Sequence, residues 1–165
     1  MAPPWLSALG FTVLPSAGSA ISRIGIEEQM KTWYPTLRRP SWCPPSWVFP
    51  PVWVTLHTSM GYGSYLIWKE LGGFTKDAVV PLGVYGTYLA LNWSWIRVFL
   101  GAHKMKLAFF QSVLMTGSAA ATVVVWFPIN RTAACLMSPT VAWLSLATAW
   151  SYWFWRNNLD KEKQK

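Results

Sequence analysis

The sequence predicts an all-α fold: an integral membrane bundle of five transmembrane helices that together form one domain. The composition supports this, because 53% of the 165 residues are hydrophobic and only 12% are charged, about half the charge of a typical soluble domain. A soluble helical bundle also carries charges on its outer faces at every turn. A spanning helix needs about 20 mostly apolar residues. Here Lys, Arg, Asp and Glu are absent from five stretches of about that length or more: 1–22, 40–68, 78–96, 107–130 and 132–155.

Proline and glycine set the ends of the expected helices. Pro50 and Pro51 suit a first helical turn, where a missing N–H costs little, and Gly72-Gly73 is a typical helix end. Pro128 breaks the fourth helix, and Pro139 predicts a kink in the fifth. The expected spans are about 5–22, 47–71, 79–98, 107–127 and 132–156.

The connection 23–45 is longer than most loops, and loops beyond about 12–15 residues are usually functional or disordered. It contains Trp33, Tyr34 and Trp42 together with several prolines, a composition unlike that of a flexible linker. We expect a structured cytosolic loop that caps the bundle; a segment lying on the lipid headgroups is the alternative. Residues 157–165 are expected to form a basic cytosolic tail.

The basic residues predict the orientation of the bundle. With alternating spans, one side carries eleven of the fourteen Lys and Arg residues and the other side carries Lys69, Lys76 and Arg131. The positive-inside rule places the cation-rich side, and with it the C-terminus, in the cytosol. The net charge of +8 therefore indicates contact with anionic headgroups rather than with nucleic acid.

The sequence lacks the residues of an enzyme or a metal site. It has two histidines, two cysteines and no carboxylate inside any expected span, so no nucleophile–base pair or carboxylate dyad is visible. Cys43 and Cys135 indicate neither a disulfide framework nor a zinc site. We expect no catalytic residue, no metal and no cofactor.

Several residues near the middle of the spans predict a ligand pocket that opens toward the cytosol. Trp143 lies at the centre of its span, while Trp53 and Trp95 lie in the cytosolic parts of theirs. Asn92 and His57 add polar groups, and intramembrane polar groups usually face the bundle interior or a cavity. The alternative is that both only form hydrogen bonds between neighbouring helices.

Other tryptophans gather near span ends, among them Trp5, Trp47 and Trp126, where an interfacial aromatic belt is expected. In the third span, the spacings Gly83-xxx-Thr87 and Gly86-xxx-Ala90 would allow close helix approach. They make a homodimer through this helix plausible.

The chain resembles the translocator protein family, also called peripheral benzodiazepine receptors or tryptophan-rich sensory proteins. The resemblance covers nearly the whole chain. Its motifs include PSWCPP at 40–45, MGYGSY at 60–65, WKELGG at 68–73, LALNW at 89–93 and AWL at 142–144.

The resemblance implies a five-helix bundle, often dimeric, that binds cholesterol and porphyrins in a pocket under the first loop. In that pocket it adds Leu107, Ala147 and Trp150 to the residues above. It also implies that Leu146, Tyr152 and Arg156 form the family's sterol-recognition motif; the L/V-x-Y-x-K/R pattern alone is weak.

The chain departs from the usual family pattern at Cys43, His57 and Leu107. Cys43, His103, Leu107 and the segment 128–134 look more like the second vertebrate paralogue, found in erythroid cells. That similarity implies the endoplasmic reticulum or plasma membrane; otherwise the mitochondrial outer membrane is expected. The family usually has a tryptophan at the position of Leu107, and we expect its absence to weaken binding of the family's synthetic ligands.

The function expected from these features is non-enzymatic binding and redistribution of cholesterol, with binding of protoporphyrin or haem precursors as a second property. One alternative is a light-dependent porphyrin-degrading protein, because Trp53 and Trp143 match tryptophans implicated in bacterial relatives. Another is a channel or transporter subunit, against which the absence of charges within the spans argues.

Overall fold

The computed structural model describes residues 2–163, so Gln164 and Lys165 of the predicted basic tail lie outside the described residues. The all-α prediction is confirmed, since this part of the chain contains helices and turns and no strand. Five helices are long, and each overlaps one of the uncharged stretches: α1 (Pro4–Ser22), α3 (Phe49–Glu70), α4 (Val79–Ile96), α5 (Met105–Trp126) and α6 (Arg131–Asn157).

Short elements occupy the connections and the end of the chain. The segment between α1 and α3 contains α2 (Glu27–Thr32) and a 3₁₀ turn at Tyr34–Thr36, and a second 3₁₀ turn, Ser46–Val48, leads into α3. A π-helical turn, Arg97–Gly101, continues α4, and α7 (Leu159–Glu162) follows α6.

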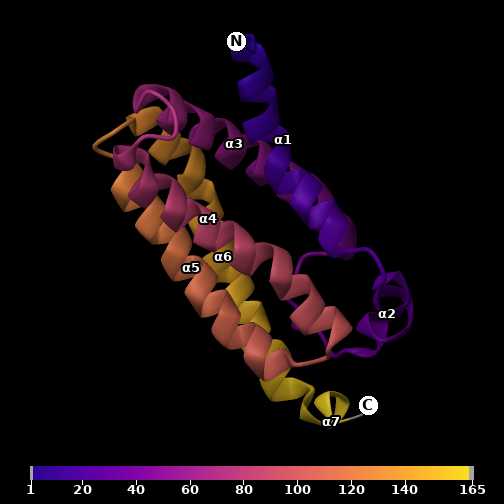
Figure 1. Cartoon of the computed structure of the whole chain (residues 1–165). Helices are drawn as coiled ribbons and strands as arrows, with labels where there is room; N and C mark the ends of the chain where they lie inside the picture. The colour runs from indigo at the N-terminus through magenta and orange to yellow at the C-terminus, as the bar shows by residue number, and fades with distance from the viewer. Residues whose placement is uncertain (1, 164–165) are drawn as a thin grey trace.

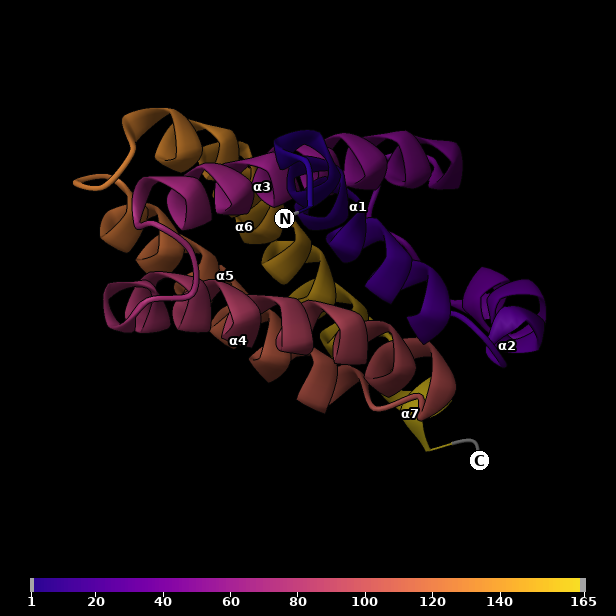
Figure 2. The same cartoon turned by 45° about the horizontal axis from the view of Figure 1, so that its top comes forward.

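The five long helices surround a common interior (Figures 1 and 2). Around this ring α1 packs on α3, α3 on α6, α6 on α5 and α5 on α4, and the ring closes where α4 meets α1. The closing contact is smaller than the others. The arrangement is therefore a closed bundle rather than a layer.

The two ends of the bundle differ in charge. Figure 1 shows the N-terminus and the α3–α4 and α5–α6 connections at one end, and α2, the α4–α5 connection and α7 at the other. We call the latter the cation-rich end. It carries ten of the thirteen Lys and Arg residues that the structure describes: Arg23, Lys31, Arg38, Arg39, Arg97, Lys104, Lys106, Arg156, Lys161 and Lys163.

Small residues determine how closely the helices approach. A Cβ atom on Gly61 would lie 2.6 Å from the carbonyl oxygen of Phe11, so only glycine lets α1 pack this tightly on α3. A Cβ on Gly63 would lie 3.0 Å from the ring of Trp126. At the end of α3, Gly72 and Gly73 have φ of 74° and 107°, which is the left-handed backbone that ends helices.

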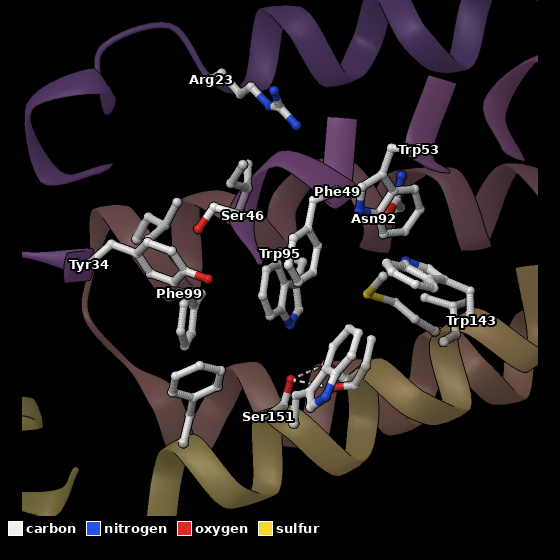
Figure 3. Close-up of a pocket in the computed structure, with 18 of the residues that line it drawn as sticks. Arg23, Tyr34, Ser46, Phe49, Trp53, Asn92, Trp95, Phe99, Trp143 and Ser151 are labelled. Carbon is white, nitrogen blue, oxygen red and sulfur yellow. Dashed lines mark hydrogen bonds between the residues drawn. The ribbon is translucent and has the colours of Figure 1, made fainter. Parts of the chain in front are cut away.

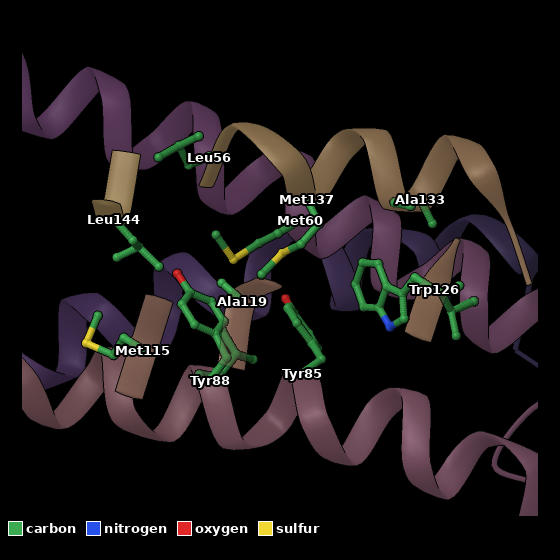
Figure 4. Close-up of a cluster of buried hydrophobic side chains, with 13 residues drawn as sticks. Leu56, Met60, Tyr85, Tyr88, Met115, Ala119, Trp126, Ala133, Met137 and Leu144 are labelled. Carbon is green, nitrogen blue, oxygen red and sulfur yellow. The ribbon is translucent and has the colours of Figure 1, made fainter. Parts of the chain in front are cut away.

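The core between α3, α4, α5 and α6 combines methionine and aromatic side chains with aliphatic ones (Figure 4). Met60, Tyr88, Met137 and Trp126 are fully buried there. The Trp126 indole N–H donates to the carbonyl of Pro81 at 3.0 Å. The expectation that Trp126 belongs to the interfacial belt is therefore wrong: its side chain points into the bundle and donates its hydrogen bond to α4.

The outer surface of the bundle is apolar. Large hydrophobic side chains are exposed on α1, α3 and α5, including Leu9, Val54, Leu114 and Val124, and an apolar surface of this extent marks a membrane or protein contact. By length and hydropathy, α5 and α6 are suited to cross a membrane. The other three long helices do not reach that hydropathy within the described chain, because they are rich in Trp, Tyr, Pro, Gly and Ser.

The segment between α1 and α3 is fastened to the end of α6 by one asparagine. The Asn158 side chain is fully buried; its Oδ1 accepts from the Arg38 backbone N–H at 2.8 Å, and its Nδ2 donates to the Arg38 carbonyl at 3.2 Å and to the Phe154 carbonyl at 3.1 Å. The Arg38 guanidinium also lies 3.7 Å from Asp160. The C-terminal residues thus hold the segment over the end of the bundle.

We expect Asn158→Leu to loosen this segment without unfolding the bundle. The change leaves the N–H and carbonyl of Arg38 without protein partners, which costs about 1–3 kcal/mol. Hydrogen exchange of the amides around Arg38, measured by mass spectrometry, should become about tenfold faster or more. The matched control is Asn157→Leu, because the Asn157 side chain is exposed and donates only to the Trp153 carbonyl of its own helix. Equal exchange in both variants would remove Asn158 from this role.

Candidate functional site

A cavity of about 210 Å³ lies toward the cation-rich end of the bundle, enclosed by α3, α4, α5 and α6 and by the segment between α1 and α3 (Figure 3). Its walls come from distant parts of the chain. Arg23, Met30, Tyr34 and Ser46 contribute from α1 and the following segment, and the helices contribute Phe49, Trp53, Asn92, Trp95, Phe99, Met115, Trp143, Ala147, Trp150 and Phe154 among others.

Helical spacing brings the aromatic side chains of α6 to the cavity. Trp143, Ala147, Trp150 and Phe154 follow i, i+4, i+7 and i+11, which places them on one helix face. The Trp143 and Trp150 rings are 5.3 Å apart and nearly perpendicular. Trp53 of α3 meets Trp143 edge-on at 6.5 Å. These rings have little freedom to move independently, so they give the cavity rigid aromatic walls.

The polar atoms of the lining differ in whether the protein satisfies them. The Trp95 indole N–H donates to the Ala108 carbonyl at 3.0 Å, and the hydroxyls of Ser112 and Ser151 lie 3.1 Å apart. In contrast, the indole N–H groups of Trp143 and Trp150 are buried and have no acceptor among the described residues. Both donor atoms are covered by neighbouring groups in this closed form of the cavity, so a ligand could reach them only if the surrounding side chains moved.

Aromatic contacts hold the segment between α1 and α3 against the bundle. Trp33 stacks on His103 of the α4–α5 connection with ring centres 3.9 Å apart, Tyr34 meets Phe99 at 6.3 Å, and Trp42 stacks on Trp150 at 6.3 Å. The sequence predicts that this segment is structured. In the fold it covers the cavity.

Two titratable side chains of the same segment are held neutral. Burial raises the pKa of the Tyr34 hydroxyl, although the nearby Arg39 guanidinium opposes the effect. Burial likewise raises the pKa of the Cys43 thiol, again against Arg39. At neutral pH, Tyr34 therefore remains a phenol at the cavity wall, and Cys43 remains a protonated thiol rather than a nucleophile.

A smaller polar chamber of about 70 Å³ adjoins the cavity between α1, α3 and α4. Its walls include Ser19, Ser22, His57 and Asn92. The Asn92 amide nitrogen lies 3.2 Å from Nε2 of His57, so this pair joins α4 to α3. The two interpretations left open for these residues are compatible, since the pair links neighbouring helices and also faces a chamber.

The structure brings most of the predicted pocket residues together. Trp53, Asn92, Trp95, Trp143, Ala147 and Trp150 line the cavity, and His57 lines the chamber. Leu107 is an exception and is corrected here: its side chain is 49% exposed on the outer surface of α5 and does not reach the cavity. The adjacent Ala108 is the residue that α5 turns inward.

The predicted sterol residues form a separate group. Tyr152 and Leu146 are 49% and 40% exposed, Arg156 is exposed as well, and none of the three lines the cavity. The Tyr152 ring contacts Phe109 of α5 at 5.3 Å. These residues therefore belong to the outer surface rather than to the enclosed pocket.

The sequence did not single out Arg23 and Phe49 as cavity residues. Arg23 is the first charged residue after 22 uncharged ones, which is also the pattern of an ordinary headgroup contact. Phe49 begins α3 beside two prolines, and no spacing pattern distinguished it from an interfacial aromatic residue.

Comparison with known proteins gives a match to the TspO/MBR family over residues 11–156. The chain belongs to the TspO/MBR family. It is 51% identical over 158 residues to "Translocator protein" of Homo sapiens, covering 96% of this chain and 94% of that protein. Members of the family are membrane proteins and so is this chain; its relatives are named as translocators and not as enzymes.

The identities bear on which branch of the TspO/MBR family the chain resembles. It is 46% identical to "Translocator protein 2" of Mus musculus over 123 residues, 74% of this chain and 76% of that protein. The corresponding value for "Translocator protein 2" of Canis lupus familiaris is 38% over 150 residues, 90% and 87%. Both values are below that for the human Translocator protein, so overall identity does not support the second paralogue that Cys43 and His103 suggested.

We expect Trp143→Ala to weaken binding of protoporphyrin, a flat aromatic probe, several-fold. An aromatic contact is worth about 0.5–1.5 kcal/mol beyond area burial, and about 1.4 kcal/mol is tenfold in affinity. Quenching of tryptophan fluorescence in the purified protein measures the binding. Trp47→Ala is the control, because this ring is 74% exposed and lies outside the cavity; Trp126 is unsuitable because it is part of the core. Identical affinities for Trp143→Ala and Trp47→Ala would show that the probe does not contact Trp143.

Proposed function

We propose that this TspO/MBR protein is a five-span membrane protein that binds cholesterol and takes part in its redistribution, and that its cavity also binds porphyrin or haem precursors. The aromatic cavity, closed by an ordered segment at the cation-rich end, is the observation that carries the proposal. The names of the relatives add transport as the general activity.

The volume of the cavity sets a condition on ligand entry. About 210 Å³ exceeds the roughly 150 Å³ of a cavity that accepts benzene and falls below the roughly 300–1,000 Å³ of sites for drug-sized ligands. A porphyrin or sterol therefore requires the cavity to expand. We expect the segment between α1 and α3 to be the element that moves. Ring contacts and the Asn158 hydrogen bonds hold it in place, whereas the long helices are held by packing along their length.

The outer face of α6 suits a sterol from the surrounding lipid. Ser145 and Ala149 are small and exposed beside Tyr152, so a flat ring system could lie along this face with Tyr152 as its wall. Arg156 follows 24 uncharged residues and would stand at headgroup depth, where a sterol hydroxyl also lies. A hydrogen bond from a charged donor is worth roughly 1.5–3 kcal/mol, less where water has access.

The orientation and the assembly of the protein belong to the same proposal. The cation-rich end is placed in the cytosol by the positive-inside rule, with the protein in the mitochondrial outer membrane or, as for the second paralogue, in the endoplasmic reticulum or plasma membrane. Gly83, Gly86, Thr87 and Ala90 lie exposed on α4, and added Cβ atoms on the two glycines would meet nothing. This face could accept a second copy.

We expect photoactivatable cholesterol to label the wild-type protein, and to label Tyr152→Ser and Arg156→Leu at least several-fold less at equal expression. The first change removes the aromatic wall and the second the charged donor. Tyr62→Ser serves as the control, because Tyr62 is also an exposed tyrosine, 43% accessible, but lies on α3. Unchanged labelling in both test variants would move the sterol away from this face.

We expect a protease added outside intact vesicles or organelles to remove a tag fused after Lys165. The reason is the ten-to-three division of described cations between the two ends, which favours a cytosolic C-terminus. A tag fused before Met1 should be cut only after the membrane is opened. The reverse pattern of protection would contradict the proposed orientation.

A further inference from the structure

We infer that the cavity binds an acidic amphipathic ligand, with Arg23 recognising its carboxylate. The inference deepens the proposed function and rests on it. Among the described residues that line the cavity or the polar chamber, Arg23 is the one with a charged side chain, and it lines both. It therefore stands where an apolar aromatic space meets a polar one.

The Arg23 guanidinium has no hydrogen-bond or ion-pair partner in the described part of the chain. No side-chain hydrogen bond and no ion pair joins it to any of residues 2–163. The ion pair found in this part of the chain joins Arg38 to Asp160. Other arginines of the cation-rich end are engaged: Arg39 donates to the Ser46 hydroxyl, and Arg97 lies within 3.4 Å of two carbonyls, those of Ile21 and Ile24.

The position of Arg23 directs its charge to the cavity. Its side chain is half-buried, and Figure 3 shows it reaching from the end of α1 toward the rings of Phe49 and Trp53. A cation beside apolar walls loses part of its hydration, and pairing with an anion compensates the free-energy cost of that loss. Guanidinium groups bind carboxylates with two parallel hydrogen bonds, so a ligand carboxylate is the group that this position fits.

Two indole donors of the cavity lining have no partner in the described part of the protein. The buried N–H groups of Trp143 and Trp150 have no acceptor among the described residues. Buried donors are normally satisfied, so a ligand that widens the cavity and carries several acceptor oxygens could satisfy both of them. A neutral sterol offers a single hydroxyl, whereas a planar acid offers carboxylate oxygens as well as an apolar body.

The polar chamber has the size of a small polar group rather than of a ring system. Its volume of about 70 Å³ corresponds to roughly two water molecules at about 30 Å³ each. Arg23, Ser19 and the His57–Asn92 pair face it from three helices. The apolar body of the ligand would therefore occupy the cavity while its acidic group lies at Arg23 and the chamber.

A phospholipid headgroup could supply the same anionic chemistry to Arg23. We assign the anion to the ligand of the cavity, because Arg23 lines both the aromatic cavity and the polar chamber. The test therefore varies the acid on the ligand and the charge of the lipid separately.

The experiment measures binding of protoporphyrin and of its uncharged dimethyl ester to the full chain in phosphatidylcholine nanodiscs. Wild type should bind the acid about tenfold more tightly than the ester, as expected for a charged hydrogen-bonded pair at a partly wet site. Arg23→Gln should remove this difference while keeping the affinity for the ester, and Arg23→Lys should retain part of it. Lys104→Gln is the control, since Lys104 carries the same charge at the same end but is exposed and outside both spaces.

Each outcome decides between distinct claims. Equal affinities of wild type for acid and ester would overturn the role of Arg23 while leaving porphyrin binding in place. Absence of binding of either compound would overturn the proposed porphyrin-binding function and this inference together. A preference that disappears when phosphatidylserine is added to the nanodiscs would assign the anion to the lipid headgroup and overturn the inference. A preference that persists there, and that is lost in Arg23→Gln but not in Lys104→Gln, supports it.

Discussion

The exclusion of charge from the middle of the helices is the constraint on which this structure depends. Ionised groups are costly inside a bilayer, so recognition within the bundle has to use rings, indole N–H groups and neutral amides. The cavity follows this rule, with aromatic walls from Trp53, Trp143 and Trp150 and a histidine–asparagine contact beside it. The charge that the site does contain, Arg23, is placed at the end of a helix, where hydration remains accessible.

The ends of the helices could be placed from the sequence. The rotation of each helix about its own axis could not. Charge-free stretches and residues such as Gly72 mark helix ends through local physics, and those signals act without the rest of the fold. Rotation about a helix axis is normally set by a contrast between polar and apolar faces. On α5 that contrast is nearly absent: Leu107 points outward and Ala108 inward, although both are apolar. The same ambiguity hid the burial of Trp126.

Part of the cavity could be predicted because large aromatic residues at mid-span have few other roles, and Trp143 is the example. Arg23 could not, because a cation beside a span is indistinguishable in sequence from a headgroup contact. The Asn158 hydrogen bonds were also beyond reach, since they join residues 120 positions apart. α6 then serves two environments at once: Trp150 faces the interior, and Tyr152, two positions on, faces outward. A shift of this one helix would alter both surfaces.

The fastening of Arg38 by Asn158 has a consequence for biosynthesis. Arg38 leaves the ribosome early, whereas Asn158 lies beyond the last long helix, and contacts between distant positions form only after the intervening chain is present. Until α6 has been inserted, the segment between α1 and α3 has no partner for its central backbone groups, and the aromatic side chains Trp42 and Trp150 cannot meet. The nascent bundle is therefore open at its cation-rich end until α6 is in place, and the segment between α1 and α3 can close the cavity only after that step.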